Sequence, residues 1–186
     1  MKNYSSKYNL FFVHIPKNAG TSINEFLEIN PDNRGHRTPL QLSELYQDYS
    51  SSLSFAIIRN PWDRMVSLYK FRKNKGHDKH LIGDYSFQQW LLSIQTPKMA
   101  GHMEWVNQYD LLFNETNLVS EVIEYSNLEE QLTIFFKKLG YNTTSLPHLN
   151  SSNGEHYSSY YNDECIEFVA KRFEKDIKAF GYEFED

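Results

Sequence analysis

The sequence predicts an α/β fold with three layers, α/β/α, around a mainly parallel central sheet. Short apolar runs rich in β-forming residues alternate with segments whose apolar residues recur at helical spacing, which is typical of strand–helix units. The chain has 186 residues, a length that suits one domain with a hydrophobic core. Aromatic residues reach 16%, so the core can bury large areas although apolar residues make up only 40%. We therefore expect a single domain over residues 1–186.

The first predicted unit is a strand, a loop and a helix. Residues 10–15 (LFFVHI) indicate a buried strand, and the loop that follows runs from Pro16 to Gly20. Thr21 or Ser22 can cap the next helix. The apolar face expected for that helix consists of Ile23, Phe26 and Leu27.

The second predicted unit is a helix, a strand and a further helix, and proline opens each of the two helices. A helix is expected to open at Pro39, and residues 53–58 (LSFAII) indicate a second buried strand. Asn60 as the N-cap and Pro61 at the first helical position then start another helix. The apolar positions of the two helices are Leu42 and Leu45 in the first and, facing the core, Trp62, Met65, Val66 and Tyr69 in the second. Residues 74–84, rich in Gly, Lys and His, are expected to form a loop.

Two more helices and two short strands are expected before the last part of the chain. Residues 109–113 and 118–123 are the strand candidates. Asn127 with Glu130 resembles a capping box, and Gly140 ends the helix that starts there. The apolar positions are Phe87, Trp90, Leu91 and Ile94 in one helix and Leu128, Leu132, Phe135, Phe136 and Leu139 in the other.

The last part of the chain is a loop followed by a helix. Residues 141–161 are polar and rich in Ser, Asn and Tyr, which indicates a long loop. Asn162 can cap the final helix, whose positive first turn holds Asp163 and Glu164. Its inward positions are expected to be Ile166, Val169, Phe173 and Ile177.

The net charge of −5 hides an asymmetry along the chain. Residues 1–80 carry a net charge of +5 and residues 81–186 one of −10. Within residues 59–80, seven basic residues stand against two acidic ones. A local positive field on an acidic chain points to an anion held in one place, and a solvated basic helix face is the alternative. The composition is not that of a general nucleic-acid binder.

Cysteine content and hydropathy narrow the class of protein further. The single Cys165 excludes an intrachain disulfide framework and a Cys-rich zinc site. No apolar run approaches 18 residues, and the N-terminal run is too short for the core of a signal peptide. We expect a soluble, cytoplasmic protein without a membrane span.

The segment HIPKNAGTS at 14–22 has the composition of an anion-binding loop between a strand and a helix. The first-turn N–H groups of a helix lack partners, and the helix dipole is positive at that end. Lys17 adds a full charge, and Gly20 lets the backbone approach a ligand. Thr21 and Ser22 add hydroxyl donors. The lysine precedes the glycine, so this is not the GxxxxGK[ST] form, and a plain capped turn is the alternative.

The segment FAIIRNPWDRMVS at 55–67 is the second candidate for anion binding. Arg59 follows a predicted strand at its carboxyl end, where open α/β sheets bind ligands. Ser67 lies about two turns into the next helix, on the same face as the N-cap. A guanidinium and a hydroxyl so placed can bracket one phosphate, whereas Arg59 alone would be read as a surface salt bridge.

These two motifs together resemble those of the sulfotransferases that use 3′-phosphoadenosine 5′-phosphosulfate (PAPS), especially the carbohydrate-acting branch. In that family the first motif binds the 5′-phosphosulfate and the second the 3′-phosphate. The later part of the chain is similar in order too, with a short strand and tyrosine at 122–125, a helix starting at Asn127, the loop LPHLNSS at 146–152, Tyr160-Tyr161 and a final helix ending DIKAFGYEF. The resemblance implies a P-loop-like phosphosulfate-binding loop.

The resemblance also implies roles for individual residues. The 5′-phosphosulfate loop corresponds to Lys17, Asn18, Ala19, Gly20, Thr21 and Ser22. Arg59 and Ser67 match the 3′-phosphate pair, and Tyr125 matches a position that often contacts adenine. The family often has Glu after that tyrosine, and here the residue is Ser126.

Sulfuryl transfer to a hydroxyl needs a base, and histidine suits that task. His36 is similar in placement to a histidine of related enzymes, and Arg34 and Arg37 beside it can orient an anionic acceptor. His14 is expected to pack beneath the loop, and His148 can contact the nucleotide or the acceptor. The histidines expected to be solvated loop residues are His77, His80, His102 and His156.

The sequence therefore predicts an enzyme, a PAPS-dependent sulfotransferase. An acceptor hydroxyl, carbohydrate by resemblance, would attack sulfur in line, with His36 as base and Lys17 offsetting charge on the leaving phosphate. No metal-ligand spacing is present, and no metal is expected. A nucleotide-dependent phosphotransferase and a noncatalytic module that binds PAP or a glycan are the two alternatives. The oligomeric state stays open.

Overall fold

The computed structural model describes residues 1–75, 85–93, 102–114, 116–117, 119–142 and 155–185. The chain divides into two compact units, which we call the sheet unit (Met1–Arg59 and Leu111–Ser152) and the helical unit (Asn60–Asp110 and Asn153–Asp186). Each unit is described by itself, and a single domain over the whole chain stays a prediction.

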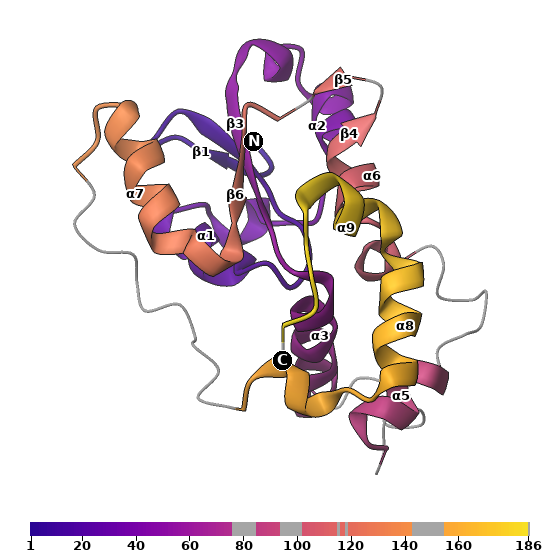
Figure 1. Ribbon diagram of the computed structural model, residues 1–186. Coiled ribbons are helices and arrows are strands. Elements are labelled where there is room, and N and C mark those ends of the chain that lie inside the picture. The colour runs from indigo at the N-terminus through magenta and orange to yellow at the C-terminus, as the bar shows by residue number, and fades with distance from the viewer. Residues whose placement is uncertain (76–84, 94–101, 115, 118, 143–154, 186) are drawn as a thin grey trace. The chain divides into compact units, whose positions relative to one another are not determined.

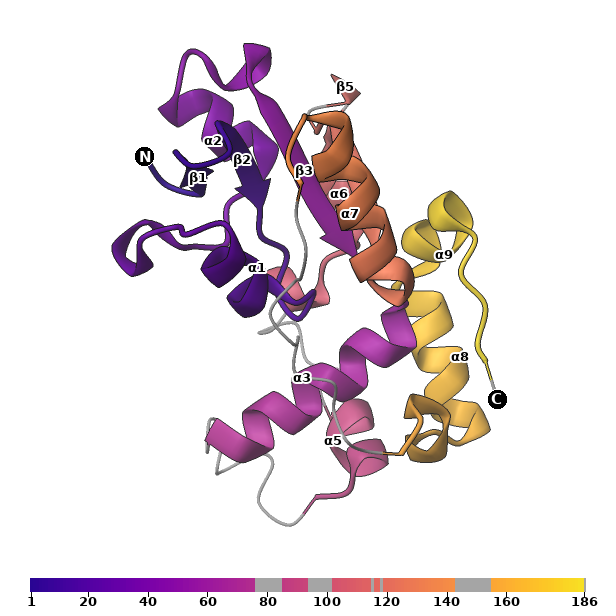
Figure 2. The ribbon, with the colours of Figure 1, turned by 90° about the vertical axis from the view of Figure 1, so that its left-hand side faces the viewer.

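A mixed sheet is the centre of the sheet unit. Its described strands are β1 (Tyr4–Ser5), β2 (Leu10–Val13), β3 (Leu53–Ile58) and β6 (Glu121–Glu124). Their order is β1-β2-β3-β6, and Figure 2 shows the first three in that order. β3 pairs in parallel with both β2 and β6, whereas β1 pairs antiparallel with β2. The α/β class is confirmed, and the two apolar runs predicted to be strands form β2 and β3.

Short helices and a small hairpin complete the described part of the sheet unit (Figure 1). The α-helices are α1 (Gly20–Phe26), α2 (Pro39–Leu45) and α7 (Leu128–Lys138). The 3₁₀ helices are η1 (Pro31–Asn33), η2 (Tyr49–Ser51) and η5 (Tyr125–Asn127). The hairpin pairs β4 (Phe113–Asn114) with β5 (Thr116–Asn117).

Alternation along the strands decides which side chains meet which helix. Alternate residues of β2 and β3, among them Phe12 and Phe55, pack with α1 and α7 in one hydrophobic cluster. Phe11 belongs to the opposite face, where its ring centroid lies 5.6 Å from that of Tyr46 and 5.0 Å from that of Tyr49. The sheet is therefore covered on both faces, which explains why β2 and β3 are apolar along most of their length.

Several local predictions for this unit were wrong. Neither Thr21 nor Ser22 caps α1, because the N-cap is Ala19 in a left-handed conformation with no side-chain cap. The capping box predicted at Asn127 is absent, since that side chain makes no cap hydrogen bond. Leu45 is 52% exposed, and residues 109–113 lie mostly in a helix, α6 (Gln108–Leu112), rather than a strand.

The predicted ends of other helices are confirmed. α2 begins at Pro39, where Thr38 and Gln41 form a capping box. α7 ends in a Schellman motif, because the N–H of Gly140 bonds to the Lys137 carbonyl at 3.0 Å and that of Tyr141 to the Phe136 carbonyl at 3.0 Å. Gly140 has a φ of 83°, which a residue with a side chain adopts only under strain.

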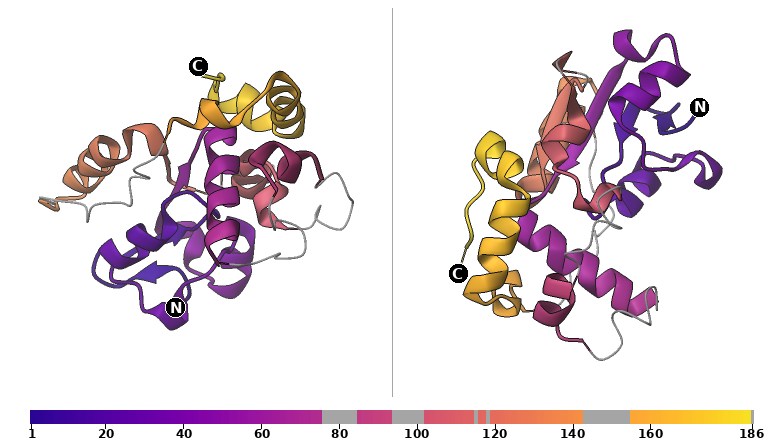
Figure 3. Two further views of the ribbon diagram at one scale, coloured as in Figure 1. Left: turned by 90° about the horizontal axis from the view of Figure 1, so that it is seen from below. Right: turned by 90° about the vertical axis from the view of Figure 1, so that its right-hand side faces the viewer.

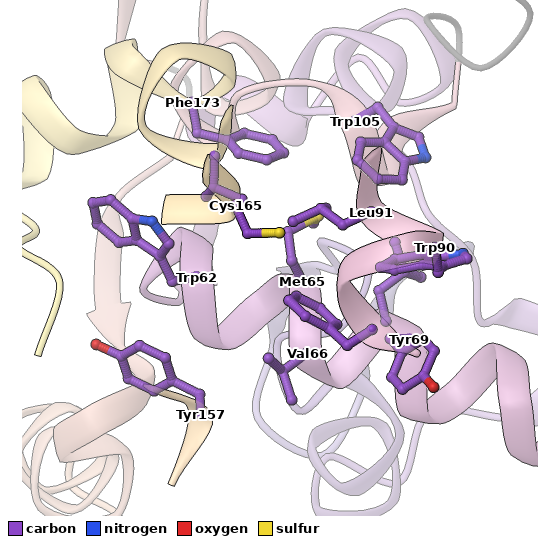
Figure 4. Packing of buried hydrophobic residues seen from close by; sticks show 13 residues of the cluster. Trp62, Met65, Val66, Tyr69, Trp90, Leu91, Trp105, Tyr157, Cys165 and Phe173 are labelled. Carbon is purple, nitrogen blue, oxygen red and sulfur yellow. The ribbon is translucent and has the colours of Figure 1, made fainter. Parts of the chain in front are cut away.

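The helical unit is built around one buried aromatic cluster (Figure 4). Its described helices are α3 (Pro61–Lys75), α5 (Phe87–Ser93), the first residues of α6, α8 (Asp163–Arg172) and α9 (Glu174–Phe180), with the 3₁₀ helices η4 (Met103–Trp105) and η6 (Tyr157–Tyr160). The cluster includes the four positions of α3 predicted to face the core, Trp62, Met65, Val66 and Tyr69, together with Trp90 and Leu91. Ile94 lies outside the described residues, as do most of the two predicted loops, 74–84 and 141–161. The described parts of these loops include helix, because α3 continues to Lys75 and residues 157–160 form η6.

Both predicted asparagine caps of this unit are confirmed. Asn60 Oδ1 accepts from the N–H of Trp62 at 3.0 Å, and Asn162 Oδ1 accepts from that of Cys165 at 3.0 Å. The single last helix of the prediction is instead two helices, α8 and α9, which are the gold and yellow segments in Figure 3. Phe173 lies at their junction and is fully buried, so the chain changes direction between α8 and α9 at a core residue.

A buried carboxylate holds the start of α6. Asp176 of α9 has no exposed surface, and its Oδ2 accepts from the backbone N–H of Gln108 at 2.9 Å and from Nε2 of the same residue at 3.1 Å. Its Oδ1 accepts from the N–H of Tyr109 at 2.8 Å. Burial raises the pKa of Asp176, while these N–H bonds and the charge of Arg64 act in the opposite direction. The carboxylate supplies partners that α6 lacks within itself.

Replacing this carboxylate should destabilise the fold. Asp176→Asn keeps the volume but turns an NH₂ group toward buried N–H donors, and we expect a loss of about 1–3 kcal/mol in unfolding free energy. Urea unfolding measures it. Glu174→Gln is the matched control, because Glu174 is an exposed acid of the same helix that pairs with Lys178, and it should change little. An Asp176→Asn variant as stable as the wild type would contradict the assignment.

Candidate functional site

The ends of three neighbouring strands bring together segments that are far apart in the sequence. Val13 pairs with Ala56, and Ile58 pairs with Glu124. Because these strands are parallel, the residues that follow β2, β3 and β6 emerge at the same edge of the sheet. Open α/β sheets bind their ligands at this edge.

The loop after β2 has a constrained backbone. Lys17 has a φ of 71° and Ala19 one of 58°, both in the left-handed region. For residues with a side chain this conformation costs about 1–2 kcal/mol each, so surrounding contacts must hold it. One of these comes from Asn18, which is buried and donates from Nδ2 to the Ile57 carbonyl at 2.6 Å. The N–H of Asn18 also donates within the protein, to the Ile15 carbonyl at 3.4 Å. The N–H groups that the loop can offer to an anion are therefore those at the start of α1.

Arg59 links this loop to the loop after β6. Its Nη1 donates to the carbonyl of Lys17 at 3.0 Å, and its guanidinium carbon lies 4.0 Å from the ring centroid of Tyr125. Only 9% of Arg59 is exposed. The guanidinium is thus held by a hydrogen bond on one side and a cation–π contact on the other. Two cations, Lys17 and Arg59, stand on loops that touch each other.

Gly20 is required by a neighbour within the protein. A Cβ built on Gly20 would lie 1.6 Å from Nε2 of His14, so the imidazole occupies the place of the missing side chain. The prediction was that Gly20 leaves room for a ligand, and the contact with His14 gives a different physical reason for the glycine. Asn24, one turn along α1, donates to the Gly20 carbonyl at 2.6 Å and lies 3.4 Å from Nδ1 of His14.

His36 lies against the same histidine. Its Nδ1 is 3.1 Å from the His14 carbonyl oxygen, which can only accept, so Nδ1 must carry the proton. This bond fixes the tautomer and leaves Nε2 of the neutral ring as an acceptor. The two ring centroids are 4.2 Å apart, and His36 is exposed.

The environment keeps His14 neutral. Burial, reinforced by the charges of His36, Lys17 and Arg34, lowers the pKa of His14 from 6.5 to about 3. His14 therefore packs without a charge against Gly20. The sequence predicted that it packs beneath the loop, and it made no prediction about the charge.

The other residues singled out in the sequence are placed as follows. Thr21 is exposed and Ser22 half-buried in the first turn of α1, and Arg34 Nε donates to the Ile29 carbonyl at 3.0 Å. Ser67 is half-buried on α3, in the helical unit, and its pairing with Arg59 stays a prediction. His102 and His156 are exposed, as expected for solvated residues. His77, His80 and His148 lie outside the described residues.

Two contacts were missed at the level of sequence. Tyr125 directly follows β6 as Arg59 follows β3, so an exact strand end would have predicted their contact; the predicted strand ended too early, at residue 123. The fit of His14 against Gly20 carries no sequence signal, because it depends on how β2 and α1 pack. In the described ranges, no group of three or more His, Cys, Asp or Glu side chains could hold a metal ion, and no helix could cross a membrane.

Comparison with known proteins identifies the family. A family model described as the sulfotransferase family matches residues 3–183, nearly the whole chain. The chain belongs to the sulfotransferase family. Comparisons with curated proteins and with solved structures gave no match. As a sulfotransferase the protein is an enzyme, and its reaction is sulfuryl transfer to an acceptor. The resemblance seen in the two motifs is confirmed at the level of the family, and the sheet edge with Lys17 and Arg59 is this sulfotransferase's candidate site.

The half-buried His14 should give this sulfotransferase an acid-sensitive stability. The unfolded chain binds a proton as pH falls below 6.5, whereas folded His14 stays neutral down to about pH 3. Its contribution to stability is therefore complete above pH 6.5 and is lost as pH falls; at pH 5 the loss is about 2 kcal/mol.

Urea unfolding at pH 5 and pH 8 tests this expectation. His14→Phe removes the titrating ring and should lack this part of the pH dependence, while His156→Phe, which replaces an exposed histidine, should keep it. If the free energy of unfolding falls equally between pH 8 and pH 5 in the wild type and in His14→Phe, the pKa of His14 is not lowered.

Proposed function

We propose that this sulfotransferase takes the sulfuryl group from PAPS and transfers it to a hydroxyl group of a carbohydrate, with His36 as general base. Membership of the family supports the reaction, and the motif resemblance supports the donor and the acceptor class. The observation that carries the proposal is the hydrogen bond from Arg59 to the Lys17 carbonyl, because it joins the two cations that the donor's two anionic ends require.

The residues at the sheet edge fit such a donor in their chemistry. We assign the 5′-phosphosulfate to a P-loop-like loop, with Lys17 as its cation and the backbone of Ala19 to Ser22 as its N–H donors. Asn18 belongs to the same loop and fixes it through its bond to the Ile57 carbonyl. The 3′-phosphate is assigned to Arg59 and Ser67, since a guanidinium gives paired hydrogen bonds to phosphate. Tyr125 is assigned to the adenine, because the resemblance matches it to a position that often contacts that base.

The geometry of the histidine pair supports the role of His36. PAPS supplies an activated sulfuryl group whose leaving group is a phosphate. His36 Nδ1 is occupied by the His14 carbonyl, so Nε2 is the atom that takes the proton from the acceptor hydroxyl as its oxygen bonds to sulfur. Lys17 compensates the negative charge that the departing phosphate gains as the sulfur–oxygen bond breaks. Neutral His14 does not compete for the proton.

Three broader expectations belong to the proposal. We infer a three-layer arrangement for the domain as a whole, a cytoplasmic setting, and chemistry that needs no metal. The rival phosphotransferase would bind ATP with Mg²⁺, and the noncatalytic module would bind PAP without turnover. Two experiments distinguish the PAPS-dependent sulfotransferase from these two alternatives.

The nucleotide product PAP should stabilise the protein far more than ATP does. A ligand at 100 times its dissociation constant adds roughly 2.7 kcal/mol, which a thermal melt resolves. ATP lacks the 3′-phosphate assigned to Arg59, so Arg59→Ala should remove the preference for PAP. Lys7→Ala is the matched control, because it removes a cation of the same unit that pairs with Glu28 at 2.6 Å and lies 5.1 Å from the ring centroid of Tyr8. Equal shifts by ATP and PAP would favour a phosphotransferase.

Transfer from labelled PAPS to a panel of carbohydrates should depend on His36. A positioned base contributes about 10²- to 10⁴-fold to the rate, so His36→Ala should lose at least that much while its affinity for PAP stays near that of the wild type. His156→Ala, at an exposed histidine, is the control and should keep the wild-type rate. A His36→Ala variant that keeps more than about a tenth of the rate would exclude His36 as the base.

A further inference from the structure

His14 contacts three described segments, namely helix α1, strand β2 and the segment that carries the candidate base. Its ring lies against the first turn of α1, and its carbonyl accepts the hydrogen bond from His36. Its ring also stacks on that of Phe12 in β2, with a centroid distance of 5.6 Å and an interplanar angle of 17°. We propose that His14 is a positioning residue, which sets the place of His36 relative to the start of α1, and that Gly20 is glycine in order to seat it. The proposal rests on the proposed function of His36.

The link between His14 and His36 has two parts. The His14 carbonyl accepts from Nδ1 of His36 at 3.1 Å, which fixes the tautomer. The centroids of the two rings are 4.2 Å apart and their planes are tilted by 50°, so the ring of His36 also packs against the imidazole of His14. His36 is exposed and lies in a segment without helix or strand. The contact with the His14 ring therefore restricts side-chain rotation of His36 that would otherwise be free.

The space that holds the His14 ring, which we call its seat, is bounded on the side opposite His36 by α1. Nε2, Cδ2 and Cε1 of the ring lie 1.6, 1.9 and 2.4 Å from the place where a Cβ on Gly20 would be. Asn24 closes the seat, with its Nδ2 3.4 Å from Nδ1 of His14 and 2.6 Å from the Gly20 carbonyl. Any residue larger than glycine at position 20 must displace the imidazole. The helix that follows the donor loop, α1, and the base are thus in contact through one ring.

His14 acts through His36 and not by proton transfer. Burial and the nearby charges of His36, Lys17 and Arg34 keep its ring neutral throughout the neutral pH range. A neutral aromatic ring of the same size should therefore do the same work, whereas loss of the ring should let His36 move. A displacement of about 1 Å at a catalytic group can cost up to about 10²-fold in rate.

Four variants of the full chain separate this role from simple packing. His14→Ala should lower kcat for transfer between about 10- and 100-fold, while the affinity for PAP stays near that of the wild type. His14→Phe keeps a neutral ring and should restore most of that kcat. Gly20→Ala should weaken both PAP binding and transfer, because its methyl group pushes the His14 ring out of its seat.

The decisive variant is the double substitution Gly20→Ala with His14→Ala. It removes the ring that the new methyl group would strike, so PAP affinity should return to the level of His14→Ala alone, while kcat stays low because no ring supports His36. If the double variant binds PAP no better than Gly20→Ala, the methyl group blocks the ligand itself, and the seat is not the reason for the glycine. If His14→Ala keeps the wild-type kcat, or if His14→Phe is as slow as His14→Ala, the positioning role is wrong.

Failure of the proposed function gives a different pattern. In that case the wild type transfers nothing from PAPS, or His36→Ala keeps its rate, whatever happens at position 14. Thermal melts without ligand of the wild type, Gly20→Ala, His14→Ala and the double variant measure the fit of the ring against Gly20 independently of activity. Gly20→Ala should lower the melting temperature in the wild-type background and not in the His14→Ala background, and equal effects in the two backgrounds would overturn the seat.

Discussion

The candidate site depends on the parallel pairing of β3 with a neighbour on each side. β2 and β6 lie against β3 in a register that brings the three following loops to one edge of the sheet. Arg59 leaves β3 at that edge, donates to the Lys17 carbonyl of the loop after β2 and stacks on Tyr125 after β6. A shift of β3 by one residue would turn Arg59 to the other face and separate these loops.

The strained backbone after β2 follows from the same arrangement. Lys17 and Ala19 keep a left-handed conformation because Asn18 is bonded to the Ile57 carbonyl and Arg59 to that of Lys17. Both anchors come from β3 or from the residue that follows it. The strain is thus carried by a buried strand, so the loop is in place before any ligand binds, and a preorganised cation needs little rearrangement to act on developing charge.

The helical unit depends on a different kind of interaction, the satisfaction of buried polar groups around an aromatic core. Arg64 has no exposed surface and donates to the carbonyls of Met103 and Val106 at 3.1 and 3.4 Å. Asp176, equally buried, accepts three N–H donors at the start of α6. These two side chains hold η4 and the start of α6 in place, because a buried polar group without a partner is costly.

The sequence by itself determined the strands β2 and β3, the starts of α2, α3 and α8, and the two motifs that place the chain among the sulfotransferases. These features are local: apolar runs, Asn or Thr caps and proline at the first helical turn act over a few residues. Only the tertiary structure decided that Ala19 is the N-cap of α1, that the last helix breaks at Phe173, and that Gly20 makes room for His14. Each of these depends on the packing of one element against another, and the distance between two ring or backbone atoms in space leaves no pattern along the chain.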